Sequence, residues 1–347
     1  MIARKSHTKE GGVKRQDVAR LAGVSPSTVS LVLNNHPAVR VAARTRERIY
    51  RAVRTLGYAP NAAARMLVTG KRDIIGVVLY FEQSPFNGYS SMLLKGIWPT
   101  IRGKRMLIGS GEGNRGAAGF FLEKLVDGLI IVAPCMKPNE ELRLLTAAGF
   151  PCTLIGSKIP NFRLDYVDID NYETARLATN YLLKAGHRRI VHITGPIDEM
   201  SSARERLAGY KAALEEGGIQ IDPALILFGN YLSASGELAI QKALQNGLKF
   251  TAIFAANDSM AFGAWRALRE HGMRVPEDIS LIGLDGVRTE DFPYSLTTYR
   301  QPLEKIGQEA AKLLLERLQG EQEWKACERL FPCEFIKGAT VAAIQEK

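Results

Sequence analysis

Short apolar runs alternate with amphipathic segments through most of the chain after residue 72. The apolar runs are strand-sized, at 74–80, 106–109, 129–133, 153–156, 190–194, 252–255 and 281–284, and helical patterns occupy 172–185, 202–216, 235–245 and 259–271. This alternation predicts an α/β architecture of parallel sheets with helices on both faces. The series is too long for one ordinary sheet, so we expect two lobes. Ligands of such sheets bind outside the carboxyl ends of the strands, which makes the cleft between the lobes the expected site.

The first 72 residues differ in charge from the rest of the chain. They contain 15 Lys and Arg and three acids, a net charge of +12, while the remaining 31 bases and 33 acids nearly cancel. A small basic module on a near-neutral body is the electrostatic pattern of a nucleic-acid-binding protein, because neutralised phosphates supply most of the non-specific affinity. The alternative is a basic, solvated surface without a partner.

The composition excludes several classes of protein. With 46% hydrophobic and 24% charged residues, the chain is neither disordered nor collagen-like. No apolar run approaches the roughly 20 residues that cross a bilayer. The basic N-terminus lacks the apolar stretch of a secretory signal, so we expect a cytoplasmic protein without a membrane partner. The four cysteines form no C-x-x-C pair and have no His at metal-ligand spacing, so we expect free thiols, no metal site and no cofactor.

Two short helices are expected near the N-terminus, at 16–22 and 26–35, with Gly23 between them. Ser25 can cap the second helix, and Pro26 suits its first turn. A third helix at about 43–56 closes an all-α core. Two short helices joined by a glycine turn form a helix-turn-helix. The outward face of the second helix carries small, hydroxylated or apolar side chains that suit close approach to DNA, namely Pro26, Ser27, Thr28, Ser30 and Leu31.

The segment 60–68 is rich in alanine but too short to be a stable helix alone in water. At this point residues 13–72 resemble the DNA-binding headpiece of the LacI/GalR family of bacterial transcription regulators, through D-V-A-R-L-A-G-V-S-P-S-T-V-S, V-L-N-N, L-G-Y-A-P-N and A-A-A-R-M-L. The resemblance implies a second helix in the major groove and a hinge helix whose leucine wedges into the minor groove. The DNA-contacting residues that it implies are Ser25, Pro26, Ser27, Thr28, Ser30, Leu31, Asn34, Asn61, Ala64 and Leu67.

The headpiece departs from the family pattern at Leu31, where an arginine is frequent. Leucine cannot make a bidentate contact with guanine, although it can contact a thymine methyl group. We therefore expect an operator half-site without strong dependence on guanine at that position.

The body resembles the same family, whose regulatory core is built like a periplasmic sugar-binding protein. The matching strings include D-N-Y-E-T-A, S-S-A-R-E-R-L-A-G-Y, A-A-N-D-S-M-A-F-G-A and R-V-P-E-D-I-S-L-I-G-L-D. The resemblance places Arg206, Asn257 and Asp285 at effector-contacting positions, and their donors and acceptors suit sugar hydroxyls. The alternative is a structural role, since Arg and Asp can pair across a cleft wall.

The body also departs from the family pattern. An Asn-Pro-Phe-Phe string is replaced by S-P-F-N, which leaves Phe86 as a ring that could stack on a sugar. I-G-S-K stands at 155–158, where many relatives carry Asp or Arg, and Asp285 is followed by Gly286. Fewer carboxylates and a nearby Lys158 hint at an anionic or otherwise unusual effector.

The resemblance implies a division of the chain into a basic tail (1–12), the helix-turn-helix domain (13–59), a hinge helix and linker (60–72) and a two-lobed core (73–347). The N-lobe would comprise about 73–170 and 302–331, and the C-lobe about 171–301 and 332–345. Two headpieces on a two-fold axis require a near-palindromic operator. The C-terminal segment is too short for the heptad helix of tetrameric relatives, so we expect a homodimer.

Two other functions remain open on the sequence alone. The string G-E-G-N-R-G at 111–116 matches the G-x-G-x-x-G of a nucleotide-dependent oxidoreductase, but it follows the second strand and lacks the acidic partner about 20 residues later. A sugar-binding protein without DNA function would not need the basic headpiece. His187 and His192 have no partner in a catalytic motif, so we expect no enzyme. We expect an effector-responsive repressor of a carbohydrate operon, with a purine-type, co-repressor-dependent regulator as the alternative.

Overall fold

The computed structural model describes residues 13–33, 41–59, 71–80, 87–111, 116–137, 140–287, 295–320 and 325–344. The chain divides after Arg72 into two compact units. Asn34, Asn61, Ala64, Leu67 and Phe86, five of the expected site residues, lie outside the described residues.

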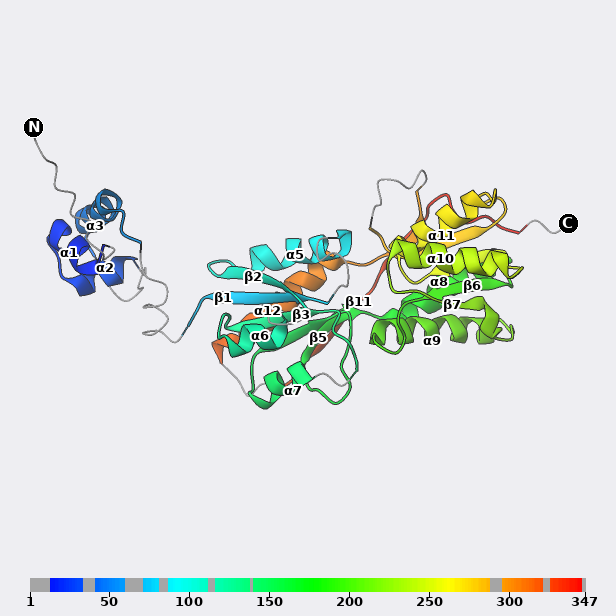
Figure 1. The fold of residues 1–347 in the computed structure, drawn as a ribbon, viewed down its shortest axis with the longest axis horizontal. Coiled ribbons are helices and arrows are strands. Elements are labelled where there is room, and N and C mark those ends of the chain that lie inside the picture. Colours follow the sequence, from blue (N-terminus) through cyan, green and yellow to red (C-terminus); the bar gives the residue numbers. More distant parts are fainter. Residues whose placement is uncertain are drawn as a thin grey trace, which may run out of the picture. The chain divides into compact units, whose positions relative to one another are not determined.

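The first unit contains three packed helices, α1 (Arg15–Ala22), α2 (Pro26–Leu33) and α3 (Ala43–Leu56) (Figure 1). One fully buried residue from each helix, Val18, Val29 and Ile49, lies in the common core. The turn between α1 and α2 depends on Gly23, whose φ of 62° lies in the left-handed region that glycine adopts without strain. The Ser25 hydroxyl accepts a hydrogen bond from the backbone N–H of Thr28 at 3.1 Å, which confirms the expected cap of α2.

The second unit is built on two six-stranded sheets. The N-lobe sheet has the order β11-β5-β4-β3-β1-β2 and is parallel throughout. Its strands are β1 (Ile74–Leu79), β2 (Arg105–Ser110), β3 (Gly128–Val132), β4 (Cys152–Ile155), β5 (Asp165–Ile169) and β11 (Glu328–Phe331).

The C-lobe sheet has the order β12-β10-β9-β8-β6-β7. Its strands are β6 (Ile190–Thr194), β7 (Ile226–Phe228), β8 (Ala252–Ala255), β9 (Ser280–Asp285), β10 (Thr297–Arg300) and β12 (Glu334–Ile336). Five of the six strands are parallel, and β12 pairs with β10 in the antiparallel sense.

Helices cover both faces of each sheet, as the sequence predicts (Figure 1). In the N-lobe, α5 (Gly88–Thr100) and α12 (Leu303–Gln319) pack on one face, and α6 (Ala117–Leu122) and α7 (Glu140–Ala147) on the other. In the C-lobe, α8 (Asn171–Lys184) and α9 (Ser201–Glu216) cover one face, and α10 (Ser233–Gln245) and α11 (Asp258–Glu270) the other. The 3-10 turn η2 (Pro223–Leu225) precedes β7.

The chain crosses between the lobes three times, from β5 to α8, from β10 to α12 and from β11 to β12. Strand β5 is absent from the expected strands because Asp165 and Asp168 interrupt its apolar pattern. Both aspartates are nevertheless buried, and both are hydrogen-bonded. Asp165 accepts from the backbone N–H of Cys327 at 2.9 Å, and Asp168 accepts from the Tyr166 hydroxyl at 2.6 Å.

Candidate functional site

Three sequence-predicted residues of the core lie on the C-lobe at or beside the carboxyl ends of its strands. Arg206 is on the second turn of α9, Asn257 follows β8 and caps α11, and Asp285 is the last residue of β9. Their exposed fractions are 5%, 7% and 7%. Buried polar residues require partners, and each of the three has partners within the protein.

Arg206 is held by two hydrogen bonds and one aromatic ring. Its Nε donates to Asn171 Oδ1 at 2.8 Å, and its Nη1 donates to the backbone carbonyl of Ala256. The guanidinium carbon lies 5.7 Å from the centroid of the Tyr231 ring, a cation–π distance. The planar guanidinium is therefore fixed in orientation, as a group that recognises a ligand needs to be.

Asn257 uses both ends of its amide within the protein. Its Oδ1 accepts from the backbone N–H of Met260 at 2.9 Å, which caps α11, and its Nδ2 donates to the Tyr231 carbonyl at 3.0 Å. An amide in these contacts has little freedom to move, and the same contacts tie α11 to the segment that carries Tyr231.

Asp285 has a backbone φ of 129°, outside the regions that non-glycine residues normally adopt. Such strain persists where surrounding structure imposes it, and it gathers at ligand sites. Gln301 Nε2 donates to Asp285 Oδ1 at 2.7 Å. Burial raises the pKa of the Asp285 carboxyl to about 8, against the opposing effect of Arg206 and with a further rise from Asp258.

Asp258 holds the loop that follows Asp285. Its carboxylate accepts from the Thr298 hydroxyl at 2.7 Å and from the Val287 backbone N–H at 2.9 Å. Burial raises its pKa to about 6, while these hydrogen bonds and Arg206 lower it. Asp258 therefore has a positioning role.

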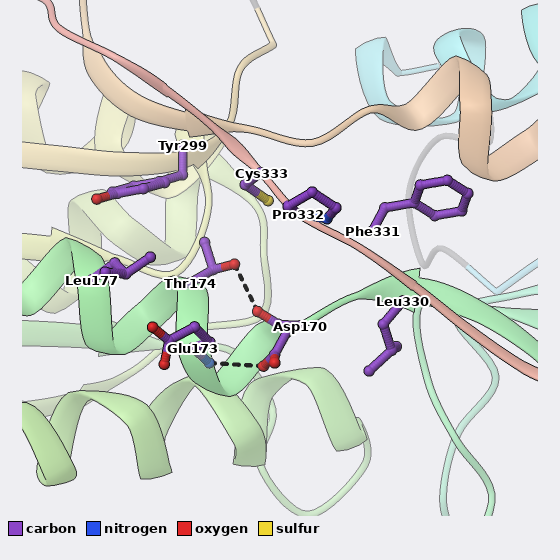
Figure 2. A pocket seen from close by; sticks show the side chains of 9 residues that line it. All are labelled: Asp170, Glu173, Thr174, Leu177, Tyr299, Leu330, Phe331, Pro332 and Cys333. Atoms are coloured by element: carbon purple, nitrogen blue, oxygen red, sulfur yellow. Dashed lines mark hydrogen bonds between the residues drawn. The ribbon is translucent and has the colours of Figure 1, made fainter.

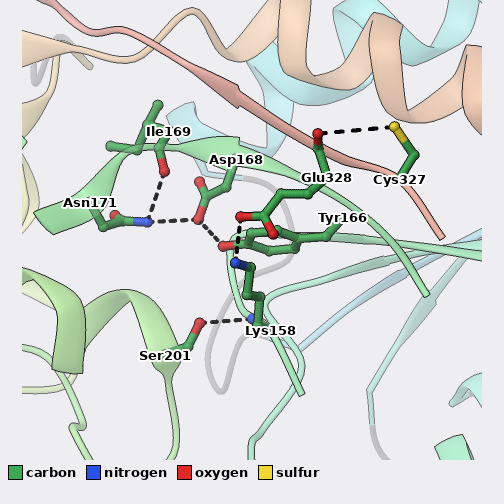
Figure 3. Close-up of polar contacts among 8 residues, drawn as sticks. All are labelled: Lys158, Tyr166, Asp168, Ile169, Asn171, Ser201, Cys327 and Glu328. Carbon is green, nitrogen blue, oxygen red and sulfur yellow. Dashed lines mark hydrogen bonds and ion pairs between the residues drawn. The ribbon is translucent and has the colours of Figure 1, made fainter. Parts of the chain in front are cut away.

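Asp168 and Asn171 belong to the same network, although the sequence analysis did not identify them. Figure 3 shows Asp168 Oδ2 accepting from the Tyr166 hydroxyl at 2.6 Å and from Asn171 Nδ2 at 2.8 Å. Burial raises the pKa of Asp168, and these hydrogen bonds and Arg206 oppose the rise. The string D-I-D-N at 168–171, where β5 ends and α8 begins, was the signal that could have identified them.

Tyr89 lies on α5 of the N-lobe, and the charges of Arg206 and Asp285 on the C-lobe act on its hydroxyl. Burial raises the pKa of its hydroxyl, and Asp168 and Asp285 raise it further while Arg206 lowers it. A Cβ built on Gly156 would lie 3.1 Å from the Tyr89 hydroxyl. Gly156, with a φ of 77°, thus leaves room for the Tyr89 hydroxyl.

The ammonium group of Lys158 interacts with two residues of the N-lobe. Its Nζ pairs with Glu328 and lies 5.1 Å from the centroid of the Tyr166 ring (Figure 3). Its backbone N–H donates across the seam between the lobes to the Ser201 hydroxyl at 2.7 Å.

A pocket of about 280 Å³ lies beside the crossing segments of the core (Figure 2). Two polar side chains at its edge are already paired, since Asp170 Oδ1 accepts from the Glu173 N–H at 2.8 Å and the Thr174 hydroxyl donates to the Asp170 carbonyl at 2.6 Å. Arg206, Asn257 and Asp285 are not among its lining residues. It is separate from the network described above.

In the headpiece, Ser25, Pro26 and Ser27 are exposed at the start of α2, and Thr28, Ser30 and Leu31 are half-buried. The Ser25 hydroxyl contacts the hydroxyls of Ser27 at 2.7 Å and Thr28 at 2.8 Å. The structure thus gathers hydroxyl groups at one helix N-terminus, where backbone N–H groups also favour phosphate.

Gly111 and the two histidines considered in the alternatives to a DNA-binding function have packing or hydrogen-bonding roles. A Cβ on Gly111 would lie 2.1 Å from the Tyr80 ring, so this glycine accommodates a packed tyrosine. His187 bonds Thr251 Oγ1 and the Ala342 carbonyl, and His192 bonds the Phe254 carbonyl. Cys135, Cys152, Cys327 and Cys333 are free thiols. Over the described ranges no His, Cys, Asp and Glu group is arranged to hold a metal ion, and no helix could span a membrane.

Two family models match the chain. The model for bacterial regulatory proteins of the lacI family covers residues 15–61, and the model for a periplasmic binding protein-like domain covers residues 179–341. The chain is 37% identical to the HTH-type transcriptional regulator CelR of Thermobifida fusca, over 88% of this chain and 91% of that protein.

Solved structures with the same arrangement include a lac repressor dimer bound to operator and the anti-inducer ONPF, with a TM-score of 0.81 and 31% identity. The match covers 96% of this chain and 100% of that one. A complex of the transcriptional regulator CelR with cellobiose matches with a TM-score of 0.72 and 31% identity, over 94% and 99% of the two chains. This chain therefore belongs to the LacI family of bacterial regulatory proteins, and it is a DNA-binding transcriptional repressor rather than an enzyme.

Proposed function

We propose that this protein represses a carbohydrate-utilisation operon and responds to a sugar or sugar derivative that binds between its lobes. It acts in the cytoplasm as a homodimer on a palindromic operator. The observation that carries the effector part of the proposal is the convergence of Arg206, Asn257 and Asp285 with Asp168 and Tyr89 at one place in the core. The cellobiose complex of the similar CelR protein supports a sugar as ligand.

The DNA-contacting residues are proposed from the geometry of α2 and from the family pattern. The hydroxyls of Ser25, Ser27 and Thr28 at the N-terminus of α2 suit phosphate oxygens, and Ser30 and Leu31 come one turn later, where base edges are read. Asn34, Asn61, Ala64 and Leu67 complete the proposed contacts. The operator of the similar lac repressor dimer supports a two-fold arrangement of headpieces.

The proposed mechanism is a linkage between two sites. The effector contacts Arg206 and Asp285 on the C-lobe and Tyr89 on the N-lobe, so its binding changes the relative stability of two lobe arrangements. The three crossing segments transmit this difference to residues 60–72, which precede β1. An effector that stabilises the arrangement with low operator affinity acts as an inducer. An effector that stabilises the arrangement with high operator affinity acts as a co-repressor.

The experiment that tests the function is selection of bound duplexes from the fragmented host genome by the purified protein. We expect a near-palindromic site upstream of genes for carbohydrate uptake or breakdown. A specific site beside genes of another pathway would overturn the carbohydrate assignment while leaving the repressor intact. Adding candidate sugars to the bound complex then shows whether operator affinity falls, as for an inducer, or rises, as for a co-repressor.

A further inference from the structure

The crossing pocket, which is the pocket drawn in Figure 2, is lined by residues at or beside all three crossings of the core. Asp170 lies between β5 and α8, Tyr299 lies on β10 before the chain returns to α12, and Pro332 and Cys333 join β11 to β12. Its volume of about 280 Å³ is at the small end of the range for ligand pockets, so it fits a molecule of about one ring. Any change in the angle between the lobes must bend the crossing segments, and the shape of this pocket therefore depends on the lobe arrangement.

Most of the wall of the crossing pocket is apolar. Leu177 on α8 and Leu330 on β11 line it and are 41% and 47% exposed. Figure 2 shows these two leucines on opposite sides of Asp170. A ring bound between them would remove apolar surface from water, which favours binding. The Cys333 thiol is a poor nucleophile, because burial raises its pKa to about 12, so the wall suits reversible rather than covalent binding.

The charged residues that line the crossing pocket are two acids, Asp170 and Glu173, without a base among the lining residues that the structure describes. Arg176 neutralises Glu173, since its Nε and Nη2 each donate to one carboxylate oxygen at 2.8 Å. Asp170 is exposed, and its Oδ1 accepts from the Glu173 N–H at 2.8 Å. Its Oδ2 has no hydrogen bond or ion pair among the described residues. The pocket therefore presents a free carboxylate oxygen beside an apolar wall, which is the complement of an ammonium group on a ring.

Asp170 is next in sequence to the residue that holds Arg206. Asn171 Oδ1 accepts from Arg206 Nε at 2.8 Å, and its Nδ2 donates to Asp168 Oδ2 at 2.8 Å. Asp168 and Asn171 are buried, whereas Asp170 is exposed and lines the pocket. The first crossing segment therefore contacts the network around Arg206 with some of its side chains and the crossing pocket with another.

We propose that the crossing pocket is a second ligand site, which binds a small molecule made of one apolar or aromatic ring and an ammonium group. The ring packs between Leu177 and Leu330, and the ammonium group pairs with Asp170 Oδ2. Such a ligand stabilises the lobe arrangement in which the walls have the matching spacing. It acts on the network around Arg206 through Asn171 without occupying the space between the lobes. This site is independent of the carbohydrate assignment, since its test uses neither a sugar nor an operator.

The test uses four probes on the full-length protein, namely phenethylamine, phenethyl alcohol, phenylacetate and ethylamine, with calorimetry at matched ionic strength. We expect the amine to bind about two- to fivefold more tightly than the alcohol, which is the range of a solvent-exposed ion pair, and phenylacetate to bind more weakly than both. Ethylamine lacks the ring and should bind about tenfold more weakly than phenethylamine, or less. Equal or tighter binding of the alcohol or of phenylacetate would overturn the proposed ligand class.

The variant Asp170→Asn removes the charge and keeps α8 capped, since Asn and Asp cap helices equally well. It should weaken phenethylamine binding by about two- to fivefold and leave binding of the alcohol unchanged. Asp222→Asn is the matched control, because Asp222 caps η2 and does not line the pocket. Equal phenethylamine affinity in Asp170→Asn and the wild-type protein, with Tm retained, contradicts the proposed ion pair.

Two cysteines show where the probe binds. Both Cys327 and Cys333 are free, partly exposed thiols, but only Cys333 is among the residues that line the pocket. We expect saturating phenethylamine to slow maleimide labelling of Cys333 several-fold and to leave labelling of Cys327 unchanged, as measured by mass spectrometry of peptides. An unchanged rate at Cys333, or the same effect at both thiols, would overturn the placement of the ligand.

Amide hydrogen exchange tests the connection to the network around Arg206. With phenethylamine at saturation we expect slower exchange in the first turns of α9, which carry Arg206 and do not line the pocket. Helix α10 is the internal control and should be unaffected. Unchanged exchange in α9, with Cys333 protected, would contradict the action of the ligand through Asn171.

Discussion

At the scale of single residues, we propose that Leu31 limits which base the headpiece can read. It is half-buried on α2, and its side chain has no hydrogen-bonding group. We predict that Leu31→Arg gains preference for guanine at one half-site position, because Arg can contact guanine O6 and N7 at once. The change is measured by duplex selection with both proteins. Leu31→Ala should lose affinity, and selection of the same operator with unchanged affinity would contradict a role for Leu31 in base reading.

His192 is a buried histidine that makes folding depend on pH. Its ring is stacked between Tyr210 and Phe254, with centroid distances of 5.0 and 4.7 Å, and its Nδ1 bonds the Phe254 carbonyl at 3.0 Å. Burial lowers its pKa to about 3, Phe254 opposes the change, and Arg206 adds to it. The folded protein therefore keeps this imidazole neutral at pH values where an unfolded chain, with an ordinary pKa of about 6.5, would protonate it.

The sign of the pH effect follows from this difference. The stability that His192 contributes is full above about pH 6.5 and falls as the pH drops toward 3. Between pH 7.5 and 5 the loss is about 2 kcal/mol in the free energy of unfolding. We predict that His192→Phe, which preserves stacking, removes this part of the pH dependence in urea unfolding. Parallel pH profiles for the two proteins would show that His192 is not responsible.

At the scale of elements, α3 fastens the turn between α1 and α2. Arg48 Nε donates to the Ala22 carbonyl at 3.0 Å, and its Nη2 donates to the Gly23 carbonyl at 3.0 Å. These carbonyls at the end of α1 have no partner within the helix. We predict that Arg48→Met speeds amide hydrogen exchange in α1 and α2, by a factor corresponding to about 1–3 kcal/mol. Arg51→Met is the control, because Arg51 is exposed and its ion pair among the described residues is with Glu47.

The start of α9 joins the lobes. Ser201 accepts from the Lys158 N–H at 2.7 Å and donates its own N–H to the Ser157 hydroxyl at 3.2 Å. Glu199 accepts from the Met136 N–H and from Lys137 Nζ, each at 2.6 Å. Arg206 lies on the same helix, so we expect these contacts to link the position of Arg206 to the separation of the two lobes.

We predict that Ser201→Ala favours a more open core, because the Lys158 N–H loses its acceptor. The radius of gyration in X-ray scattering should rise, and effector affinity should fall several-fold. Ser233→Ala on α10 is the matched control, since the Ser233 hydroxyl is buried without a hydrogen-bond partner among the described residues. Equal behaviour of the two variants would argue against a role for Ser201 in lobe closure.

At the scale of the whole molecule, the two units have different chemistry. The first 72 residues carry a net charge of +12, whereas the core is nearly neutral. Operator affinity should therefore fall steeply with salt, by about 0.9 log units per tenfold change in salt for each phosphate neutralised. The proposed effector contacts lie in the buried network of the core, so we expect effector affinity to change little with salt.

The linkage between the sites gives a quantitative test for the intact protein. If the effector changes operator affinity by some factor, operator DNA must change effector affinity by the same factor. We predict equal factors from fluorescence anisotropy of labelled operator and from calorimetry of the effector with and without DNA. Unequal factors would mean that the two ligands do not act on one shared equilibrium.

The sequence by itself determined the three-helix headpiece and most elements of the lobes. Gly23, the Ser25 cap and the apolar stripe of α3 are local signals, and local periodicity reports burial directly. The strands β1, β3 and β8 are likewise continuous apolar runs. Strand β5 was not predicted, because two aspartates interrupt its apolar pattern. Their hydrogen bonds with Tyr166, Asn171 and Cys327 form only once the sheet has formed.

The tertiary structure alone decided which polar groups meet. Asp168, Arg206 and Asp285 come from β5, α9 and β9, and the order of strands and the crossings bring them together. The paired state of Lys158, the cap formed by Asn257 and the place of Tyr89 beside Gly156 follow from the same packing. Contacts between residues far apart in sequence leave no local pattern, so this network of buried polar groups became visible only in the folded chain.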